Sequence, residues 1–567
     1  MFSLPRNCRL INSLLFILFA SSIHADDWNR FRGPGGTAVS GGRRLPVTWS
    51  GKANLDWKTA LPGPGASSPI VVGERVFVTC YSGYGLDRNE PGEMKNLVRH
   101  LICLSLSTGR IIWQKEIKAD LPEDPFTGIG VTAHGYASHT PVSDGKNVYA
   151  FFGKGGVHAF SMEGKPLWNL NVGKESDPAR WGSSSSPIVF ENTLIVTASA
   201  ESQAIVGIDK MTGRELWRQE AKGLDGMWGT PSLVRVDDSR TDLVMCVAKE
   251  IWGMNPKNGE LRWFARATDA QQAYASVVPG KKQVFAVTGR GGGSVAIRLG
   301  GEGDVSNTHT IWEGRETASF ASPVLYESRL YVVANKILKV IDAENGKVVK
   351  QFRLKGARSG GRTRQLDYPS PVVASGHLYY LDGGGNMYVF DIRNEPKQVA
   401  LNRVTDEAES FWGTPAIKGG QLLMRSSRYL YCVADKGEKA ETDSDLLSGP
   451  EEGLPPSGGE SRNGNGRGGN RFDPAAMFAS MDPNKDGKVT FQELKGNRMA
   501  DRLKTLDKDG DMAISREEFV KGMSSLLNRC GSDRGRSAGG GSRGGGYGRG
   551  GLDKRPKRPQ RPKMETS

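Results

Sequence analysis

The sequence has few cysteines and histidines for its length, and it lacks the cysteine arrangements that hold a zinc ion or a haem. Six cysteines and seven histidines occur among 567 residues. No CxxC, CxxCH or adjacent cysteine pair is present, which excludes a zinc ribbon and a covalently attached c-type haem. Most of the cysteines lie in strand-like apolar runs, as small buried core residues do. A disulfide between Cys80 and Cys103 is the alternative in an oxidising compartment.

The chain also lacks an apolar run long enough to cross a membrane, since a spanning helix needs about 20 apolar residues. The run LLFILFA (14–20) is shorter; it follows Arg6 and Arg9, and small residues lead on to Ala25. This pattern predicts a signal peptide over residues 1–25 and no transmembrane span, with an uncleaved anchor as the alternative. We therefore expect an exported protein, in the periplasm, outside the cell or on the cell envelope.

Positive charge is in excess, but its distribution is uneven. The formal net charge is +14, and the tail at 531–567 contributes half of it. A uniformly basic body is thereby excluded, and no nucleic-acid partner is expected. The segments 436–471 and 531–567 have little apolar content, which predicts a disordered linker and a disordered Gly/Arg-rich basic tail. A plain solvated tail is the commonest case for such a segment, and polyanionic envelope polymers or lipid head groups are the partners that we expect if it binds.

A repeat dominates the remaining sequence, residues 26–435. A small polar residue, a proline and an alternating apolar stretch recur, and a degenerate copy (274–287) fills one gap. The wide first interval carries insertions at 84–96 and 119–136. Eight starts predict eight repeat units. The other intervals between neighbouring copies are 44–48 residues, and the prolines are Pro69, Pro141, Pro187, Pro231, Pro323, Pro371 and Pro415.

Each unit continues into a second pair of strands joined by a glycine turn, as in LICLSLSTGRIIWQ (101–114). Four short strands in a period of about 40 to 50 residues predict an all-β, eight-bladed propeller over 26–435. The last unit lacks its fourth strand, whereas LDWKTA (55–60) near the N-terminus has no partners of its own. Pairing these two segments would close the ring. The last strand of a unit carries a tryptophan at one equivalent position, at Trp113, Trp168, Trp217 and Trp263.

These residues resemble a known family. The repeat A/C-x-D-x-x-T-G-x-x-x-W is similar to the Trp-docking repeat of the pyrroloquinoline-quinone (PQQ) dehydrogenases and of the BamB-like outer-membrane assembly propellers. The stretches WNRFRGPGG (28–36), HGYASHTP (134–141) and RYLYCVAD (428–435) further resemble secreted PQQ-like repeat proteins of planctomycete-type bacteria. The resemblance implies the propeller fold, but one propeller hosts many activities.

A quinoprotein enzyme, as the resemblance implies, would need PQQ, a Ca²⁺ ion, a catalytic Asp and usually an adjacent cysteine pair. The cysteine pair and any haem motif are missing, and the other residues do not map onto this sequence. We therefore predict no catalytic residues, no cofactor-binding residues and no PQQ in the propeller. His134 and His139 are the remaining catalytic candidates, because a histidine pair can bind metal or shuttle protons. We favour the alternative that both are hydrogen-bonded loop residues at the propeller rim.

What the resemblance to BamB-like proteins implies is a rigid disc with wide faces and a central channel, used for binding. We expect a monomeric binding or assembly scaffold at the cell envelope that presents a propeller face to an unidentified protein partner. A PQQ-dependent oxidoreductase and a glycan- or polyanion-binding envelope protein are the alternatives.

The stretch DPNKDGKVTFQE (482–493) has the pattern of a twelve-residue EF-hand calcium loop. Gly487 occupies position 6, where the sharp turn requires it, and Val489 occupies position 8, where paired loops form a short β-bridge. Oxygen-only ligands suit Ca²⁺ better than the stricter geometry of Mg²⁺. The predicted ligands are Asp482, Asn484, Asp486, the carbonyl of Lys488, Thr490 and Glu493.

A second loop, DKDGDMAISREE (507–518), departs from this pattern at position 6, where Met512 replaces glycine. A bulky side chain at positive φ costs on the order of 1 kcal/mol, so we expect weaker binding or a distorted turn. Ile514 at position 8 allows the two loops to pair. The predicted ligands are Asp507, Asp509, Asp511, the carbonyl of Ala513, Ser515 and Glu518.

Helices are expected on both sides of these loops, which gives a small α-helical EF-hand pair over 472–530 of the abbreviated kind found in secreted bacterial proteins. Apolar residues flank both loops: Met477, Phe478 and Met481 precede loop one, Met499, Leu503 and Leu506 precede loop two, and Phe519, Val520, Met523 and Leu527 follow it. A module of this size without disulfides is marginal on its own, and bound Ca²⁺ can supply the missing stability. Because extracellular calcium is abundant, we expect a stabilising element and not a switch.

Overall fold

The computed structural model describes residues 27–42, 44–127, 130–289, 291–354, 368–438, 440, 478, 486–491, 503, 506–507, 509–519 and 558–559. They belong to two compact units, one of residues 1–456 with 554–567 and one of residues 457–553. Among the described residues, no helix combines the length and hydropathy that a membrane span requires. The predicted signal peptide and most of the predicted linker and tail lie outside the described residues.

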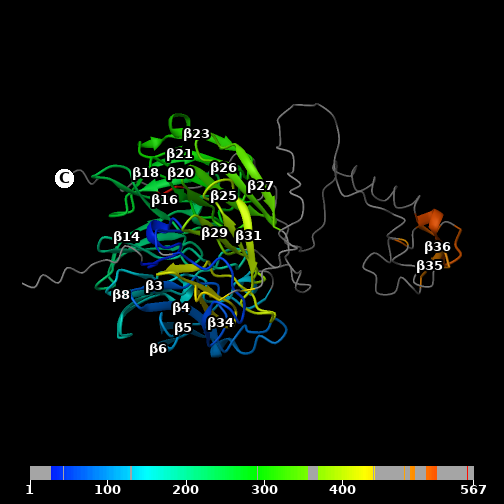
Figure 1. The fold of residues 1–567 in the computed structure, drawn as a ribbon. Helices are drawn as coiled ribbons and strands as arrows, with labels where there is room; N and C mark the ends of the chain where they lie inside the picture. The colour runs from blue at the N-terminus through cyan, green and yellow to red at the C-terminus, as the bar shows by residue number, and fades with distance from the viewer. Residues whose placement is uncertain are drawn as a thin grey trace, which may run out of the picture. The chain divides into compact units, whose positions relative to one another are not determined.

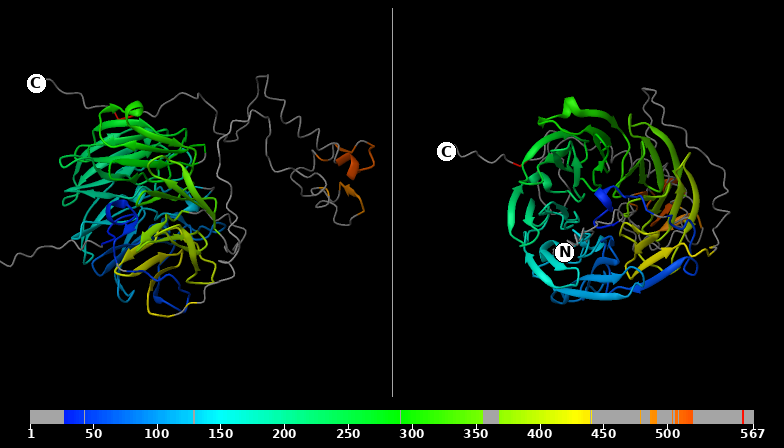
Figure 2. Two further views of the ribbon diagram at one scale, coloured as in Figure 1. Left: turned by 45° about the horizontal axis from the view of Figure 1, so that its top comes forward. Right: turned by 60° about the vertical axis from the view of Figure 1, so that its left-hand side comes forward.

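The first unit contains eight sheets arranged around one axis (Figures 1 and 2), as the repeat predicts. In most sheets four antiparallel strands follow one another in chain order. Four of the sheets consist of four consecutive strands and nothing else. They are formed by β3 (Ile70–Val72), β4 (Arg75–Ser82), β5 (Val98–Ser105), β6 (Ile111–Lys118); β7 (Val142–Ser143), β8 (Asn147–Phe151), β9 (Val157–Ser161), β10 (Pro166–Leu170); β11 (Ile188–Phe190), β12 (Thr193–Ala198), β13 (Ala204–Asp209), β14 (Glu215–Glu220); and β24 (Val324–Tyr326), β25 (Arg329–Ala334), β26 (Ile337–Asp342), β27 (Val348–Arg353).

The other four blades take in a segment from elsewhere or an insertion. They are β15 (Ser232–Arg235), β16 (Thr241–Val247), β17 (Glu250–Met254), β18 (Leu261–Arg266) with the parallel β22 (Gly303–Asp304); β19 (Val278–Pro279), β20 (Gln283–Val287), β21 (Ser294–Arg298), α1 (Ser306–His309), β23 (Thr310–Gly314); β28 (Val372–Ala374), β29 (His377–Leu381), β30 (Met387–Asp391), β31 (Lys397–Asn402) with the parallel β1 (Val39–Ser40); and β32 (Ala416–Lys418), β33 (Gln421–Arg425), β34 (Tyr429–Ala434) with β2 (Leu55–Ala60). Short 3-10 turns are η1 (Pro34–Gly36), η2 (Met94–Asn96), η3 (Val131–Ala133), η4 (Gly153–Gly155) and η5 (Lys222–Leu224).

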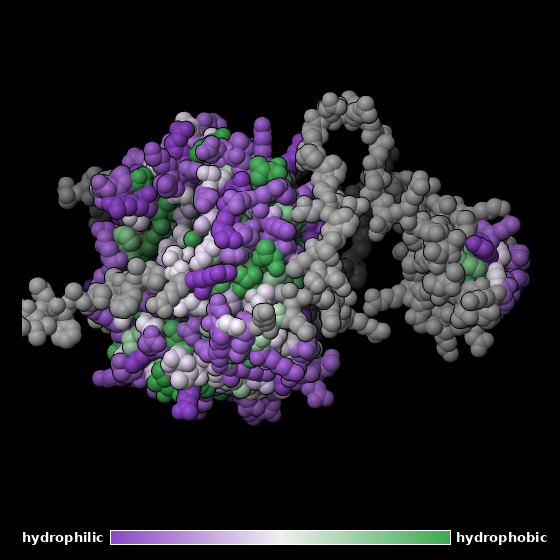
Figure 3. Space-filling model, viewed as in Figure 1, coloured by the Kyte–Doolittle hydropathy of each residue, from purple (hydrophilic) through white to green (hydrophobic). Residues whose placement is uncertain are grey.

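The burial of each strand follows from its place in a blade. The second and third strands are covered by neighbouring blades on both faces, so β12 is buried along its whole length and reads as a continuous apolar run. Outer strands such as β6 are largely exposed. Exposed apolar side chains on these strands include Leu167 and Leu216, and hydrophilic residues cover much of the propeller face seen in Figure 3. Such isolated residues are ordinary on a protein surface.

Ring closure occurs as the sequence predicts. Strand β2 pairs antiparallel with β34, and Trp57 faces Cys432 across the pair. The indole N–H of Trp57 donates to the carbonyl of Leu106 at 2.8 Å, in the turn of the next blade. In that turn Gly109 has φ +68°, and a Cβ there would lie 2.5 Å from the Trp57 ring. This glycine therefore serves both the turn and the tryptophan contact.

The other tryptophans repeat this docking on the following blade. Trp113 donates to the carbonyl of Met162 at 2.9 Å, and Trp168 donates to that of Lys210 at 3.0 Å. Trp312 continues the pattern on Ala343. Trp263 departs from it, since its indole donates to the buried carboxylate of Asp242 at 2.8 Å. The indole hydrogen bond therefore recurs at four blade junctions, whereas Trp217 Nε1 has no hydrogen-bond partner among the described residues.

The N-terminal segment crosses the hub of the ring, which the repeat does not predict. The backbone N–H of Ser143 donates to Asn29 at 2.9 Å, Arg30 donates to Pro231, and Arg32 donates to Pro323. These partners belong to the inner strands of three different blades. Strand β1 then pairs with β28. The right-hand view of Figure 2 shows the dark-blue start of the chain inside the ring. The axis is therefore not an empty channel.

The cysteines of the propeller are free. Cys80, Cys103, Cys246 and Cys432 are buried, and the strand register places Cys80 opposite His100 and Cys103 opposite Phe77. The alternative of a Cys80–Cys103 disulfide is thereby wrong, because the two residues are not paired across the strands. Burial raises the pKa of the Cys80 and Cys103 thiols to about 12, so they stay protonated.

In the second unit the two calcium loops pair as predicted. Strand β35 (Lys488–Thr490) pairs antiparallel with β36 (Ala513–Ser515), and Val489 faces Ile514. Of the predicted flanking helices, the structure describes one helical turn at residues 516–519. Most other residues of the predicted helices lie outside the described part. Among the described residues, apolar side chains of the two loops and their flanks form one buried cluster: Phe478, Val489, Leu503, Leu506, Ile514 and Phe519.

Candidate functional site

A closed ring of hydrogen bonds surrounds the axis of the propeller. The hydroxyl residue before each inner strand accepts a hydrogen bond from the backbone N–H of its counterpart in the preceding blade, at 2.9–3.0 Å in all eight cases. None of the eight hydroxyls donates to a protein acceptor among the described contacts. We call this set the hydroxyl ring, and it consists of Ser68, Thr140, Ser186, Thr230, Ser276, Ser322, Ser370 and Thr414.

Aromatic side chains stand above part of this ring. In five successive blades an aromatic residue lies two positions before the ring hydroxyl, and Trp181 extends the series. Neighbouring rings are in contact: the centroids of Trp228 and Tyr274 lie 5.1 Å apart at 17°, and those of Phe320 and Tyr368 lie 4.9 Å apart. All of these side chains are half-buried. We call them the aromatic arc, which consists of Trp181, Trp228, Tyr274, Phe320, Tyr368 and Trp412.

The hydroxyl ring and the aromatic arc line one axial cavity of about 770 Å³. Phe31 of the crossing N-terminal segment also lines it, whereas its neighbours Arg30 and Arg32 are buried away from it. Burial lowers the pKa of Arg30 to about 10 and that of Arg32 to about 9, with repulsion by Arg30 contributing to the latter. No Asp, Glu, Lys or Arg is among the described residues that line the cavity.

The histidine pair is split between the cavity wall and the interior. His134 lines the cavity; its Nε2 donates to the carbonyl of Trp181 at 2.6 Å, and its Nδ1 accepts from the Ser138 hydroxyl at 2.5 Å. His139 is buried, with Nε2 at 3.0 Å from the Ser183 hydroxyl. Burial lowers the pKa of His134 and brings that of His139 to about 3. Both imidazoles are therefore hydrogen-bonded loop residues, as we favoured, but they lie at the cavity wall and in the interior and not at the propeller rim.

A buried ionic cluster lies behind His134. Arg99 pairs with Glu123 at 2.6 Å, and Lys154 pairs with Asp124 at 3.1 Å. The Ser183 hydroxyl donates to Glu201 Oε1 at 2.6 Å, and Glu201 Oε2 has no partner in the described structure. Burial raises the pKa of Glu201 to about 7. Sequence reasoning did not single out this cluster, because its members come from separate connections.

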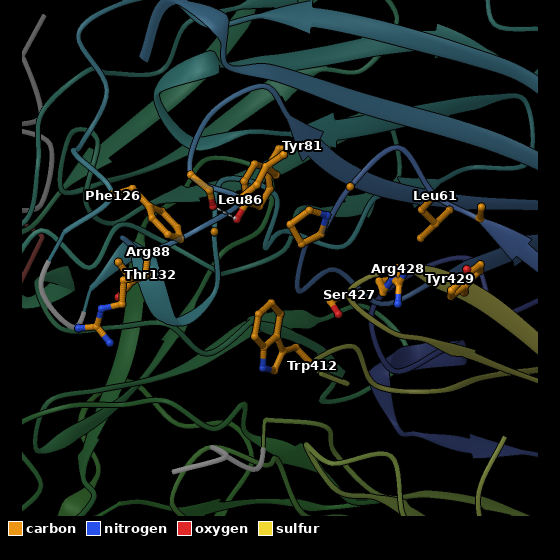
Figure 4. Close-up of a pocket in the computed structure, with 15 residues that line it drawn as sticks. Leu61, Tyr81, Leu86, Arg88, Phe126, Thr132, Trp412, Ser427, Arg428 and Tyr429 are labelled. Carbon is orange, nitrogen blue, oxygen red and sulfur yellow. Dashed lines mark hydrogen bonds between the residues drawn. The ribbon is translucent and has the colours of Figure 1, made fainter. Parts of the chain in front are cut away.

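A second hollow adjoins the axial cavity and shares Trp412 with it. This groove, of about 580 Å³, runs between the first blade and the last (Figure 4). In Figure 4 Trp412 lies near the middle of the lining, with Phe126 and Arg88 toward one end and Leu61 and Tyr429 toward the other. The Tyr81 hydroxyl in its wall donates to the carbonyl of Gly85 at 3.1 Å. Aromatic side chains recur in the linings of both the cavity and the groove.

The second predicted calcium loop brings its acidic side chains together. Carboxylate oxygens of Asp507, Asp509 and Asp511 lie within 4.8 Å of one another, the only such metal-compatible group among the described residues. Met512 keeps the φ of +68° that glycine would favour, and its side chain is 66% exposed. The turn is thus undistorted, and the strain predicted for Met512 is present. Glu518 Oε2 accepts from the backbone N–H and the hydroxyl of Ser515 at 2.9 and 2.8 Å.

Loop one is described in part, and it contributes an unexpected contact. The Lys488 ammonium lies 2.7 Å from Asp511 Oδ2, so a residue of loop one donates to a ligand of loop two. This hydrogen bond raises the pKa of Lys488 and lowers that of Asp511. The loop-one ligands Asp486 and Thr490 are described with Lys488, and those outside the described residues are Asp482, Asn484 and Glu493.

Comparison with known proteins agrees with the architecture. A family described as outer membrane protein assembly factor BamB matches residues 98–352. None of the curated proteins matches the chain. Among solved structures, BamB from Moraxella catarrhalis is similar at 11% identity and TM-score 0.47, over 68% of this chain and 99% of that one. A quinohemoprotein alcohol dehydrogenase from Comamonas testosteroni shows 12% identity and TM-score 0.48, over 81% and 85% of the two chains.

Proposed function

Because the chain is a PQQ-like, BamB-like β-propeller repeat protein, we propose that it is a binding scaffold and not an enzyme. The axial cavity and the adjoining groove hold an extended, uncharged segment of a partner protein. The observation that supports this proposal is the composition of the cavity lining. Its described residues include aromatic side chains and hydroxyl groups but no charged side chain.

This lining suits a polypeptide backbone. Each member of the hydroxyl ring uses its oxygen to accept one backbone hydrogen bond, which leaves its proton for a ligand acceptor such as a peptide carbonyl. Aromatic side chains supply large contact area at low entropic cost, and the contacts within the aromatic arc already fix their orientation. The groove then continues the path past Trp412 to Arg428.

A glycan is the second candidate, and one observation favours it. The arc presents a row of half-buried aromatic faces to a cavity whose described lining residues carry no charge. Sugar rings offer apolar faces for such contacts and hydroxyl oxygens for the hydroxyl ring. A peptide and a glycan therefore compete for the same walls, and binding of one probe or the other distinguishes them.

The quinone cofactor that the family resemblance implies does not fit the described walls. PQQ carries three carboxylates and is bound with Ca²⁺, so its site needs cationic and carboxylate side chains together. The described cavity lining contains neither, and Arg30 and Arg32 are buried away from it. No redox step is therefore assigned to the propeller.

For the second unit, we propose that each EF-hand loop binds Ca²⁺ and that the ions stabilise the module. The support is the paired loops, the gathered carboxylates of loop two and the apolar cluster beneath them. An envelope location is supported by the signal-peptide pattern and by the description of the matching family as an outer membrane assembly factor.

The test is the equilibrium binding of two defined uncharged probes to the full chain, measured by tryptophan fluorescence and by calorimetry. One probe is an end-blocked Ser/Thr/Val peptide, and the other is a linear β-1,4-linked glucose oligosaccharide. Phe320→Ala and Trp228→Ala remove faces of the aromatic arc, and Leu216→Ala, on the outer strand β14, is the matched control.

We expect one probe to bind and its affinity to fall about tenfold or more in each arc variant. The reason is that each lost aromatic contact removes roughly 1–2 kcal/mol of binding free energy. The Leu216→Ala control should bind like the wild type. Absence of binding by both probes, or equal loss in the control, would contradict the proposal. Reduction of a dye acceptor that appears only after PQQ and Ca²⁺ are added would establish the enzyme alternative instead.

A further inference from the structure

A second binding site lies on the fourth blade, around the carboxylate of Glu250. This residue opens β17 directly after Lys249, whose positive φ of 67° makes the turn from β16. The Lys249 backbone N–H donates to Ala270 at 3.1 Å, which ties the turn to the connection that leads into the next blade. Glu250 is only 4% exposed, and its Oε2 accepts from the Trp252 indole at 2.9 Å.

A buried carboxylate is costly unless a cation pairs with it. The cation here is supplied by the C-terminal tail. Arg558 Nε donates to Glu250 Oε2 at 2.9 Å, and Arg558 Nη2 donates to Oε1 at 2.6 Å. This two-pronged pairing uses the planar guanidinium in the geometry that lysine cannot reproduce.

An aromatic face completes the site. The guanidinium carbon of Arg558 lies 3.3 Å from the centroid of the Phe264 ring, within the range of a cation–π contact. The following residue, Pro559, is buried. The two hydrogen bonds to Glu250 and the ring of Phe264 both contact the Arg558 guanidinium, and the proline beside it is buried, so general attraction between opposite charges is not sufficient to explain the arrangement.

The tail sequence repeats this unit. Three Arg-Pro dipeptides begin at Arg555, Arg558 and Arg561, three residues apart in KRPKRPQRPK (554–563). Polyproline II structure has three residues per turn, so in that conformation equivalent residues would share one side of the segment. The spacing predicts that any of the three arginines can enter the same site.

We propose that Glu250 and Phe264 form a recognition site for Arg-Pro segments and that its ligand is the C-terminal tail of the same chain. The tail thereby closes back onto the propeller and occupies the site in cis. This assignment goes beyond the axial cavity, since no residue of the Glu250 site lines that cavity. It also gives the basic tail a defined partner, where composition alone predicts a solvated or polymer-binding segment.

The experiment measures binding of a fluorescein-labelled peptide of residues 554–563 to the full chain by anisotropy. In the wild type the tethered tail competes at a high effective concentration, so the peptide should bind at least about tenfold more weakly than to a tail variant. That variant is Arg555→Ala/Arg558→Ala/Arg561→Ala. Adding Glu250→Gln to it should lower the peptide affinity at least about tenfold, while Gln still accepts from Trp252. Asp269→Asn is the matched control, an exposed carboxylate of the same blade.

A second measurement separates recognition from general charge attraction and from misfolding. A peptide with lysine at all three arginine positions keeps its charge and should bind about fivefold or more weakly. Glu250→Asp keeps the negative charge but shortens the side chain. This variant should also bind the labelled peptide more weakly, while its melting temperature stays unchanged. Equal affinity for the tail variant with Glu250→Gln and with Asp269→Asn would overturn the proposal. So would equal affinity for the wild type and the tail variant, or for the arginine and lysine peptides.

Discussion

The propeller and the calcium module reach a stable arrangement by different routes. In the propeller, all eight blades share the hydroxyl contact and some share the tryptophan contact, and the last contact of each kind returns to the first blade. In the module, the described residues form a small apolar cluster, and the three aspartates of loop two gather beside Lys488 of loop one. The ring closes through contacts of its own, whereas we expect the gathered carboxylates, which repel one another, to need a bound cation.

Trp57→Ala is expected to give the largest effect, because it breaks the ring at its closing blade. Removing this buried ring should lower the free energy of unfolding of the propeller by about 3–5 kcal/mol. Trp113→Ala, at an ordinary blade interface, is the comparison variant. Denaturant unfolding measures both. The closure account requires Trp57→Ala to be at least as damaging, and a negligible effect would contradict it.

The buried Glu201 should make the stability of the propeller depend on pH. Burial raises the pKa of Glu201 to about 7, above the ordinary value of a glutamate. The free energy of unfolding is therefore highest below that ordinary pKa and falls as the pH rises through 7. Glu201→Gln should remove this dependence and stabilise the protein at pH 8 by up to about 3 kcal/mol. Thermal unfolding at pH 5 and pH 8 checks this. Parallel loss in both proteins would show that another group titrates.

In the module, Glu518→Gln should remove most calcium binding by loop two. The variant replaces the carboxylate at position 12 by an uncharged amide with a single oxygen, whereas this position coordinates calcium through two carboxylate oxygens. We expect about a thirtyfold or larger loss in affinity at one of two sites by calorimetry on the full chain. Glu517→Gln, the neighbouring substitution, is the control. If both variants titrate alike, loop two is not a calcium site.

Ser276→Ala tests the hydroxyl ring at a smaller scale. It removes the acceptor of the Thr230 backbone N–H and leaves that donor buried. The expected loss is about 1–2 kcal/mol of propeller stability. Ser319→Ala, an exposed residue of the cavity lining, should change stability little. Identical stabilities in chemical denaturation would mean that the ring is incidental.

The smallest expected effect belongs to Lys488→Gln. Its ammonium competes with an incoming ion for Asp511, so its removal should strengthen calcium binding at loop two about two- to fivefold. The gain should shrink as salt is raised, because the group is exposed. Titrations at low and high ionic strength measure this. A weaker site in the variant would show that Lys488 supports the loop instead.

Much of the propeller could be predicted from the sequence because its contacts recur. The repeated prolines, the turn glycines and the tryptophans indicate eight blades, and Trp57 identifies the closing strand before any coordinates are known. Pairing of Val489 with Ile514 follows likewise from position 8 of the calcium loops. Local patterns were sufficient wherever a contact is set by fixed spacing.

The cavity and the Glu250 site could not be predicted in this way, because their residues are distant in sequence. The aromatic arc does leave a signal in the sequence. An aromatic residue stands two positions before the hydroxyl residue of the repeat, as in the stretches WGTP (228–231) and FASP (320–323). The crossing of Arg30 and Arg32 and the return of Arg558 have no such periodic signal. They depend on which blades the folded ring brings near each terminus.

The most direct measurement is scanning calorimetry of the full chain in millimolar calcium and in excess chelator. The account predicts two transitions, of which the smaller, from the module, moves to a much lower temperature or disappears when calcium is removed, while the large propeller transition stays in place. A single transition that shifts as a whole with calcium, or a small one that ignores it, would contradict the division between a self-closing ring and an ion-dependent module.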